Sequence, residues 1–524
     1  MDYVILKKEH LKWAIFKIAF CIRVKYRSQV MIQKLCEEIL AGNNVRENLI
    51  ELNKRIKEDS ELDRFLDVYY EYETQFYALF QDEDAKVRKN VIKIFGRVAD
   101  PVLLDMLLQG YKEETTQFLK SDYLNAIESF DYKEHLDFFK DQLKAVANRE
   151  RNKHSIEEMK ALQTLIWKIE PPQKHTFVYG DRVERLLLVV PKGHERIVED
   201  AVREIPETTV RSMQGGCAIQ TKHLEQVRDV RMYQALLFDF YPAMIPSMDG
   251  KVIGEKMVEQ GILEFLNRHH KEYTSFIFRV DVKGITDMMK KNQLAKTLAL
   301  SLEEKSHGLL INDSSYYEIE IRVIVGNKGC RVFLKMSTLP DSRFQYRKYI
   351  MATSMQPSKA ALMMRYIKPY MKEDANVLDP FCGTGTLLIE RALAGKVKSL
   401  YGLDISSSAI QAAWENSQRA GKVLNLVQRN FNDFRHEYTF DEILTDMPRE
   451  SAHMKGKQLE YVYQLLFLRS RELLTENGIL AVYCEDEYLM ERCIKANPWI
   501  KRLKKVIMTK DQTSFVYILQ KLYK

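Results

Sequence analysis

The sequence predicts a multidomain protein with an all-α N-terminal region, an α+β middle and an α/β, Rossmann-like C-terminal domain. Three observations lead to this prediction. Residues 1–170 contain almost no glycine or proline and are rich in helix-forming residues. Residues 175–340 alternate short apolar strands with helices. Residues 376–390 have the pattern of a buried strand, a glycine turn and the start of a helix, which is how a doubly wound domain begins.

Composition sets broad limits. A chain of 524 residues with 46% hydrophobic content can bury several cores, and its length predicts about three domains. The net charge of +7 is a mild bias that permits a polyanionic partner without requiring one. The seven cysteines have no C-x-x-C spacing, which argues against a disulfide framework or a metal site, so we expect a cytoplasmic protein. The apolar stretch 13–24 is too short to span a membrane and is expected to be a core helix.

In the N-terminal region two stretches align at an offset of 32 residues. Phe95 aligns with Ile127 and Leu104 with Leu136. Such a period predicts stacked helical hairpins, and residues 85–108 resemble a short HEAT-type repeat, a unit that stacks because a single hairpin cannot cover its own apolar face. Two interpretations stay open: a docking surface for a protein partner, and a helical cap that only stabilises its neighbour.

The proline pair Pro171-Pro172 predicts the end of this helical region, because paired prolines favour an extended linker. The pattern then changes to that of an α+β domain, with a hairpin around the turn 326–329. The predicted strands are 185–190, 208–211, 217–220, 234–240, 274–280, 318–325 and 330–336, and the predicted helices are 195–205, 224–232, 251–269 and 293–305.

Residues 341–374 form a basic segment in which aromatic residues are interleaved with Lys and Arg. We interpret it as a linker and helix that face RNA, because cations bind phosphates and aromatic rings stack on bases. The alternative is an ordinary solvated helix face. The candidate RNA-binding residues are Arg343, Arg347, Lys348 and Lys359.

The run Asn376–Glu390 (NVLDPFCGTGTLLIE) is the most informative part of the chain. Gly383 and Gly385 allow a ligand to approach the backbone, and the helix that follows would begin beside that ligand. The dinucleotide fingerprint is not matched, because Leu388 stands where its third glycine would be. The next predicted strand ends in Asp404, where a βαβ unit places an acid on the ribose hydroxyls of a cofactor. These features predict an adenosine-type cofactor.

Three motifs in order, DPFCGTGTLLIERA, YGLDIS and TDMP, resemble those of the THUMP-containing class I S-adenosylmethionine-dependent RNA methyltransferases of the guanine-N2 type. The resemblance covers roughly residues 175–524. It implies a ferredoxin-like unit plus a THUMP RNA-binding domain at 175–340, and a methyltransferase domain at 375–524. It further implies S-adenosylmethionine as cofactor and a structured RNA, tRNA or rRNA, as substrate. The alternative is an unrelated doubly wound domain.

The resemblance also implies a set of cofactor-binding residues. Asp379 and the glycines would surround the methionine end of the cofactor, Asp404 would hold its ribose, and Asn430 would accept from the adenine amine, with Asp433 as the nearby alternative. In the simpler interpretation Asp379 caps the glycine turn and Asn430 is a turn residue. The full set is Asp379, Pro380, Phe381, Cys382, Gly383, Thr384, Gly385, Thr386, Asp404, Ile405, Asn430, Phe431 and Asp433.

The segment Asp446-Met447-Pro448-Arg449 is the predicted catalytic loop. An exocyclic amine on an aromatic ring is a poor nucleophile because its lone pair is delocalised. Asp446 and the Met447 carbonyl would accept its two hydrogens and turn the lone pair toward the methyl group, while Pro448 stiffens the loop.

This loop departs from the family, which has a second proline in place of Met447 and an aromatic residue in place of Arg449. We expect the Arg449 guanidinium to stack on the base and to hold a phosphate. Two alternatives stay open. One is a catalytically degenerate protein that keeps the cofactor fold and binds RNA, and the other is an enzyme that methylates an amine of another nucleic acid, such as adenine in DNA.

Overall fold

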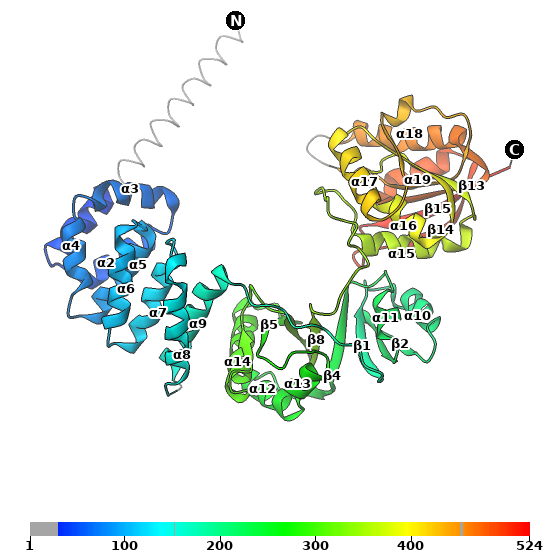
Figure 1. The fold of residues 1–524 in the computed structure, drawn as a ribbon. Coiled ribbons are helices and arrows are strands. Elements are labelled where there is room, and N and C mark those ends of the chain that lie inside the picture. Colours follow the sequence, from blue (N-terminus) through cyan, green and yellow to red (C-terminus); the bar gives the residue numbers. More distant parts are fainter. Residues whose placement is uncertain (1–29, 151, 451–453, 524) are drawn as a thin grey trace, which may run out of the picture. The chain divides into compact units, whose positions relative to one another are not determined.

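The computed structural model describes residues 30–150, 152–450 and 454–523 (Figure 1). The chain divides after Gln173, beside the proline pair, into two compact units that we describe separately. The core helix expected at 13–24 lies outside the described residues. No helix in the described part of the chain is long and apolar enough to span a bilayer.

The N-terminal unit is helical throughout its described residues, as predicted. Asp84 caps α5 and Asn152 caps α9, so short polar side chains begin both helices. After a helix at residues 30–40, the helices are α2 (Val45–Arg55), α3 (Asp59–Tyr69), α4 (Glu73–Phe80), α5 (Ala85–Val98), α6 (Val102–Glu113), α7 (Gln117–Ile127), the short η1 (Lys133–His135), α8 (Leu136–Ala147) and α9 (Lys153–Ile169).

The two aligned stretches of the sequence fall on α5 with α6 and on α7 with α8, but the consecutive helices that pack as hairpins are α4 with α5, α6 with α7 and α8 with α9. The second helices of these hairpins stack, because α5 packs against both α2 and α7, and α7 packs against α9. Gly96 makes the α5–α7 contact close: a Cβ at this position would come within 2.8 Å of Cα of Ala126. The stack of hairpins is therefore present, and its assignment as a HEAT repeat stays a prediction.

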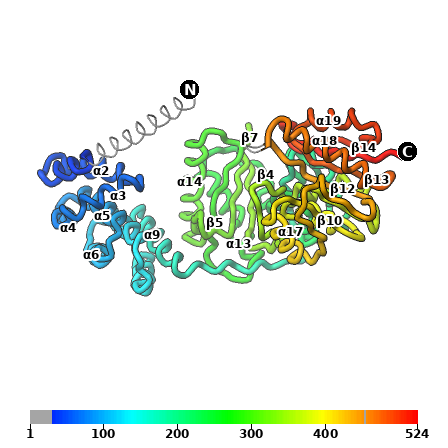
Figure 2. The backbone as a smooth tube through the Cα atoms, turned by 90° about the horizontal axis from the view of Figure 1, so that it is seen from above, coloured from blue at the N-terminus to red at the C-terminus, as the bar shows by residue number. Residues whose placement is uncertain are grey.

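The middle domain is one eight-stranded sheet in the order β2-β3-β1-β4-β8-β7-β5-β6. Most of its pairs are antiparallel, and β5 is parallel to both β6 and β7. The strands are β1 (Glu184–Val189), β2 (Thr209–Met213), β3 (Gly216–Thr221), β4 (Ala235–Ile245), β5 (Phe276–Lys283), β6 (Leu310–Asn312), β7 (Ile319–Gly326) and β8 (Gly329–Met336). The helices are α10 (Glu195–Arg203), α11 (Leu224–Arg228), α12 (Gly250–Glu259), α13 (Ile262–Arg268) and α14 (Met288–Lys305), and α14 packs alongside β5 (Figure 2).

Three details of this domain differ from the sequence prediction. The helix predicted at 251–269 is two helices, because Gly261 adopts a left-handed conformation with φ +84° between them. The helix α14 begins at Met288 rather than at 293, because the Asp287 side chain caps it. Strand β6 was not predicted because it has only three residues. The ferredoxin-like and THUMP assignment stays a prediction.

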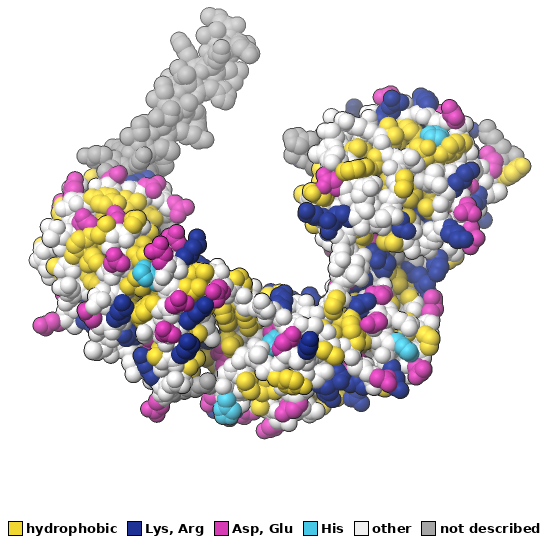
Figure 3. Space-filling model, viewed as in Figure 1, with side chains coloured by type: hydrophobic (Ala, Val, Ile, Leu, Met, Phe, Trp, Pro, Cys, Tyr) yellow, Lys and Arg dark blue, Asp and Glu magenta, His cyan; other side chains and the backbone are white. Residues whose placement is uncertain are grey.

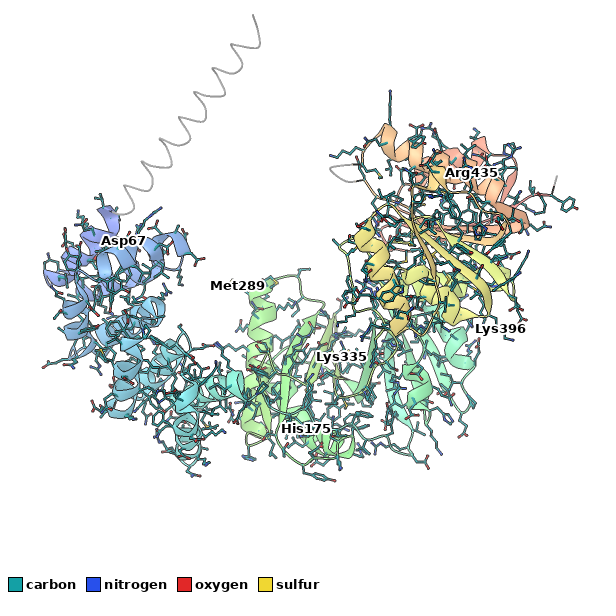
Figure 4. The ribbon with its side chains drawn as sticks, turned by 45° about the horizontal axis from the view of Figure 1, so that its top comes forward. Asp67, His175, Met289, Lys335, Lys396 and Arg435 are labelled. Atoms are coloured by element: carbon teal, nitrogen blue, oxygen red, sulfur yellow. The ribbon has the colours of Figure 1, made fainter. Side chains whose placement is uncertain are left out.

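The start of the second unit is fixed to the middle sheet by buried polar contacts. His175, which Figure 4 labels, is buried. Its Nδ1 lies 2.8 Å from Oε1 of Glu318, the residue before β7. The backbone N–H of His175 donates to the other carboxylate oxygen of Glu318. The residues that follow the proline pair are therefore part of this domain.

The C-terminal domain confirms the α/β prediction. Its seven-stranded sheet has the order β11-β10-β9-β12-β13-β15-β14, parallel from β11 to β13, with β15 antiparallel to both of its neighbours. The strands are β9 (Ala375–Asp379), β10 (Val397–Asp404), β11 (Asn425–Gln428), β12 (Phe440–Asp446), β13 (Leu474–Cys484), β14 (Ile500–Ile507) and β15 (Phe515–Lys521). The helices are α15 (Pro357–Ile367), η2 (Lys368–Tyr370), α16 (Thr386–Ala394), α17 (Ser407–Arg419), η3 (Phe431–Asp433), α18 (Lys457–Leu473) and α19 (Glu487–Ala496).

The middle and C-terminal domains are joined within the second unit by polar contacts around Glu390. This side chain on α16 is buried and accepts hydrogen bonds from Arg231, at 2.7 and 2.9 Å, and from Tyr346 Oη, at 2.7 Å. His194 of the middle domain makes a second contact, with its Nδ1 2.9 Å from Oη of Tyr366. These contacts hold the loop before β4 and the start of α10 against α16 and α15.

Candidate active site

A cavity of about 590 Å³ opens at the carboxyl ends of β9, β10 and β12. In an open α/β sheet this edge is where ligands bind, because the loops that follow neighbouring parallel strands meet there. Its walls are the glycine turn after β9, the loops after β10, β11 and β12, the segment 351–355 and the first part of α18. The predicted cofactor turn and the predicted catalytic loop therefore line one cavity.

The glycine turn leaves room beside its backbone. Gly383 has φ +50°, and a Cβ at this position would meet no atom within 4 Å. Its backbone N–H donates to Oδ2 of Asp404 at 3.1 Å, which ties the turn to the end of β10. Gly385 has a different role from the predicted one, because it does not line the cavity. A Cβ there would lie 3.2 Å from Cβ of Ala413, so this glycine allows α17 to pack close to the turn.

Asp379, the last residue of β9, is buried at the base of the cavity. Its Oδ1 accepts hydrogen bonds from the backbone N–H of Phe381 at 3.1 Å and from Thr445 Oγ1 at 3.0 Å. Burial raises the pKa of this carboxyl to about 8, and the nearby carboxylates of Asp446 and Asp404 contribute to the rise. The group is therefore poised to ionise when a cation lies next to it.

The loops after β10 and β11 complete the cofactor side of the cavity. Oδ1 of Asp404 accepts from the backbone N–H of Ser406 at 2.8 Å, so both oxygens of this carboxylate are held by backbone groups. Asn430 lines the cavity and caps η3 by accepting from the N–H of Asn432. Asp433, predicted as a cofactor-binding alternative, is exposed and lies outside the residues that line the cavity.

The catalytic loop begins with Asp446 at the end of β12. Oδ1 of Asp446 is buried and has no hydrogen-bond partner among the residues that the structure describes. Burial raises the pKa of this carboxyl to about 7, while the charges of Arg449 and Lys359 act to lower it and Glu485 acts to raise it. The next residue, Met447, is buried, and its N–H donates to the Tyr483 carbonyl at 2.9 Å, so the loop starts in a fixed position.

Arg449 lies over the rim of this loop. Its guanidinium is 3.7 Å from Oδ2 of Asp446 and 3.2 Å from Oε1 of Glu485, and it lies 5.9 Å from the centre of the Tyr483 ring. The Lys359 ammonium is 3.1 Å from Oη of the same tyrosine. Two cations thus flank the buried carboxylate of Asp446.

Part of this domain matches the model of a known family. Residues 345–514 match the model of the UPF0020 family, described as an RMKL-like methyltransferase domain. This part of the chain is a methyltransferase domain. The match begins within the basic segment, includes the glycine turn and the catalytic loop, and ends just before β15. The cofactor of this domain is S-adenosylmethionine.

Relatives and solved structures agree with the methyltransferase domain. A tRNA (guanine(10)-N2)-dimethyltransferase of Methanothermobacter thermautotrophicus is 23% identical over 48% of this chain and 75% of its own length. The U6 snRNA (guanine-N(2))-methyltransferase THUMPD2 of Bos taurus is 24% identical over 45% of this chain, which spans only about half, 49%, of that protein. The crystal structure of TrmN from Thermus thermophilus aligns over 65% of this chain and 100% of its own, with a TM-score of 0.51 and 19% identity, which shows a shared fold.

The residues predicted to bind RNA lie outside the cavity of the methyltransferase domain, and one of them is wrongly assigned. Arg343 is only 8% exposed. Its guanidinium binds Asp341 and the carbonyls of Val230 and Tyr233, and it packs on the ring of Tyr233 at 3.6 Å, so it is a structural anchor. Arg347 donates to two carbonyls of the segment 354–355, and Lys348 is exposed.

Several residues of the cavity were not predicted. Ser354 Oγ lies 3.1 Å from Oγ1 of Thr384, which holds the segment before α15 against the glycine turn. Asn416 on α17 strengthens this contact, because its side chain donates to the carbonyls of Tyr349 and Thr384. No motif marked these positions in the sequence. The additional lining residues are Met351, Thr353, Ser354, Met355, Leu387, Arg429, Glu450, Met454, Tyr461, Val462 and Leu465.

Proposed function

We propose that this protein transfers a methyl group from S-adenosylmethionine to the exocyclic N2 of a guanine in a structured RNA, a tRNA or an rRNA. The observation that carries the proposal is Asp446, which lines the same cavity as the glycine turn and whose buried Oδ1 has no hydrogen-bond partner among the described residues. The guanine-N2 methyltransferases among the relatives support the choice of base. The middle domain, expected to be of the THUMP type, would hold the RNA.

The residues of the cavity fit S-adenosylmethionine. The open space beside Gly383 leaves room for a ligand against the backbone, and Asp404 presents a carboxylate at the end of the second strand for a ribose. The buried carboxyl of Asp379 suits the positively charged methionine end, and Asn430 would accept from the adenine amine. When bound, S-adenosylmethionine supplies an electrophilic methyl group.

Asp446 would then act on the guanine amine. Its free Oδ1 accepts one N2 hydrogen and the Met447 carbonyl accepts the other, so that the nitrogen lone pair points toward the methyl donor. Because burial holds the pKa of Asp446 at about 7, the carboxylate is also suited to take the proton that the amine loses. The loop needs little movement, since Met447 is already fixed by its hydrogen bond to Tyr483.

Arg449 would replace the aromatic residue of related loops. A guanidinium plane can stack on a base, and its charge can bind a phosphate at the same time. Glu485 holds this side chain at the rim of the cavity, next to Asp446. The base would therefore lie between Arg449 and the carboxylate that accepts its hydrogens.

The proposal is tested by the transfer of labelled methyl from S-adenosylmethionine to total RNA, fractionated into tRNA and rRNA. We expect label in one fraction and a loss of about 100-fold or more in Asp446→Asn, the usual range for a group that acts in proton transfer. The matched control is Glu437→Gln, an exposed carboxylate of the same domain outside the cavity, which should retain activity. Calorimetry with S-adenosylmethionine should show equal cofactor binding by all three proteins.

Other outcomes separate the alternatives. A protein that binds the cofactor and RNA but transfers no label to any fraction would be an RNA-binding protein with a degenerate site. Label that appears in duplex DNA in preference to folded RNA would point to an amino-methyltransferase of another nucleic acid.

A further inference from the structure

The N-terminal unit contains a groove of about 770 Å³ on one face of its helical stack. Three neighbouring helices, α2, α5 and α7, form it. Each contributes side chains at helical spacing from a single face: positions 46, 50, 53, 54 and 57 from α2 and the turn that follows it, 86, 89, 93 and 97 from α5, and 118, 122, 125 and 129 from α7 and its end.

The groove concentrates positive charge. Seven of its sixteen lining residues are Lys or Arg, and Asp122 is the one acid among them. Residues 30–170 as a whole are acidic, with 28 Asp and Glu against 21 Lys and Arg. Acidic and basic side chains are interspersed on the face of this unit that Figure 3 shows. Positive charge is therefore concentrated in the groove, although the unit as a whole is acidic.

Most of these cations are available to a ligand. Asp122 pairs with Lys89 at 2.9 Å and more weakly with Lys93 at 3.7 Å, so one carboxylate serves two of them. Arg97 donates to the carbonyl of Asn53. The other four are exposed and form no ion pair with any described residue: Arg46, Lys54, Lys57 and Lys86.

The remaining lining residues favour a nucleic acid over a protein. Protein partners are usually anchored by buried apolar and aromatic side chains, whereas here Ile50 and Phe118 are the large apolar residues of the lining. Asparagines supply neutral polar groups instead. Asn53 is 7% exposed, and its buried Oδ1 has no partner within the described part of the chain, so one hydrogen-bond acceptor among the lining residues is unfilled.

We propose that this groove binds the phosphate backbone of the RNA that the methyltransferase domain modifies, so the inference rests on the proposed function. The stripe from Lys86 to Arg97 is about 16 Å long at the rise of an α-helix, enough to follow several consecutive phosphates. Phe118, with the Lys89 ammonium 5.6 Å from its ring centre, offers a surface on which an unpaired base can stack. The helical unit then increases affinity for RNA through contacts independent of the methylated base.

The test uses the full chain and fluorescently labelled bulk tRNA, with binding measured by anisotropy at several salt concentrations. The groove variant is Lys54→Gln/Lys57→Gln/Lys86→Gln. The matched control, Lys133→Gln/Lys144→Gln/Lys153→Gln, removes three exposed charges of the same unit outside the groove. We expect the groove variant to bind about 10-fold or more weakly and to lose about 2 from the slope of log affinity against log salt, while the control changes little. Equal losses in both variants, or none in the groove variant, would overturn the proposal.

Two further measurements separate this proposal from the proposed function. If the groove variant has a higher KM for RNA but the same kcat at saturating RNA, the groove proposal and the proposed function are both supported. If the wild-type protein methylates no RNA, yet tRNA binding still depends on the groove, the proposed function fails and the groove remains an RNA site. A groove variant that binds tRNA normally but no longer binds polyglutamate would assign the groove to an acidic protein segment and overturn the proposal.

Discussion

Arg449 lies 3.7 Å from Oδ2 of Asp446, while Oδ1 of the same carboxylate has no hydrogen-bond partner among the described residues. One oxygen thus lies near a cation, and the other is a buried acceptor that these residues leave without a hydrogen bond. Glu485 holds the guanidinium from the other side at 3.2 Å. The resembled family has an aromatic residue at the position of Arg449. In this chain the position carries a positive charge instead, and this charge favours the ionised form of Asp446.

The first prediction concerns pH. Arg449 acts to lower the pKa of Asp446, which burial raises to about 7, so Arg449→Gln should raise that pKa further. A shift of about one unit would leave roughly a tenth of the carboxylate ionised at pH 7, against about half in the wild type. Single-turnover methyl transfer, measured from about pH 6 to about pH 9, should therefore fall several-fold at neutral pH and recover at high pH.

The control for this prediction is Arg449→Lys, which keeps the positive charge and should show a smaller shift of the pH profile. A loss of the same size at every pH would contradict the electrostatic role. Arg449 would then act by holding the base or its phosphate.

The second prediction uses two glycines with the same backbone conformation. Gly383 has φ +50° and Gly421 has φ +61°, and a Cβ at either would meet no atom within 4 Å. The strain of placing alanine in this conformation is therefore similar at both, about 1 kcal/mol. Only Gly383 lines the cavity, so Gly383→Ala should weaken S-adenosylmethionine binding by about 10-fold or more while Gly421→Ala does not. Calorimetric titration measures the affinity, and equal affinities would show that the cofactor does not approach Gly383.

The cofactor side of the site could be predicted because it lies in short, continuous segments. The run that begins at Asp379 fixes a strand end, a turn and a helix start within a few residues, and Asp404 follows the next strand. In parallel strands these ends must meet at one edge of the sheet. Asp433, the predicted alternative to Asn430, does not reach the cavity. The chain turns into η3 after Asn430, which leaves the Asp433 carboxylate exposed.

The other wall of the cavity could not be predicted, because its contacts join distant segments. Ser354 meets Thr384 only once α15 has packed on α16, and no local pattern encodes that contact. Arg343 was wrongly assigned for a similar reason. Its partners, the carbonyls of Val230 and Tyr233, lie over a hundred residues away, and a basic residue in a basic segment gives no sign of such burial. Strand β14 was not predicted because four of its eight residues are lysine or arginine and its register shifts between Arg502 and Lys504, so its buried residues do not alternate.

The third prediction is a pH-dependent stability caused by Asp379. Its pKa is about 8 in the folded protein and about 3.8 without the fold. Between these values the folded state keeps a proton that the unfolded chain releases, so stability falls as pH rises from about 4 to about 8. Asp379→Asn should therefore unfold at a higher temperature than the wild type at about pH 9, with little difference at about pH 4. Scanning calorimetry tests this, and a variant that is equally destabilised at both pH values would contradict it.

The same carboxyl should couple cofactor binding to pH. The positive charge of S-adenosylmethionine favours the ionised form of Asp379, so its affinity should increase with pH up to about 8, with protons released on binding. Titrations in buffers of different ionisation enthalpy would count these protons. Asp379→Asn should abolish the release, and a variant that releases as many protons as the wild type would assign them to another group.

The last prediction concerns the ion pair that fixes α16 to the sheet. The side chains of Arg391 and Glu442 are 1% and 0% exposed, and Nε of the arginine lies 2.6 Å from Oε2 of the glutamate. Arg391→Met leaves Glu442 buried without its partner and should lower the free energy of unfolding of this domain by about 3–5 kcal/mol, since a lone buried charge is costly. Replacing both, as Arg391→Met/Glu442→Leu, should restore most of that loss, because the desolvation of both charges is then avoided. Denaturant unfolding of the three proteins measures the difference. A double variant less stable than Arg391→Met would show instead that the ion pair contributes net stability. If this double variant also bound the cofactor more weakly than the wild type, α16 would depend on the ion pair to hold the glycine turn in place.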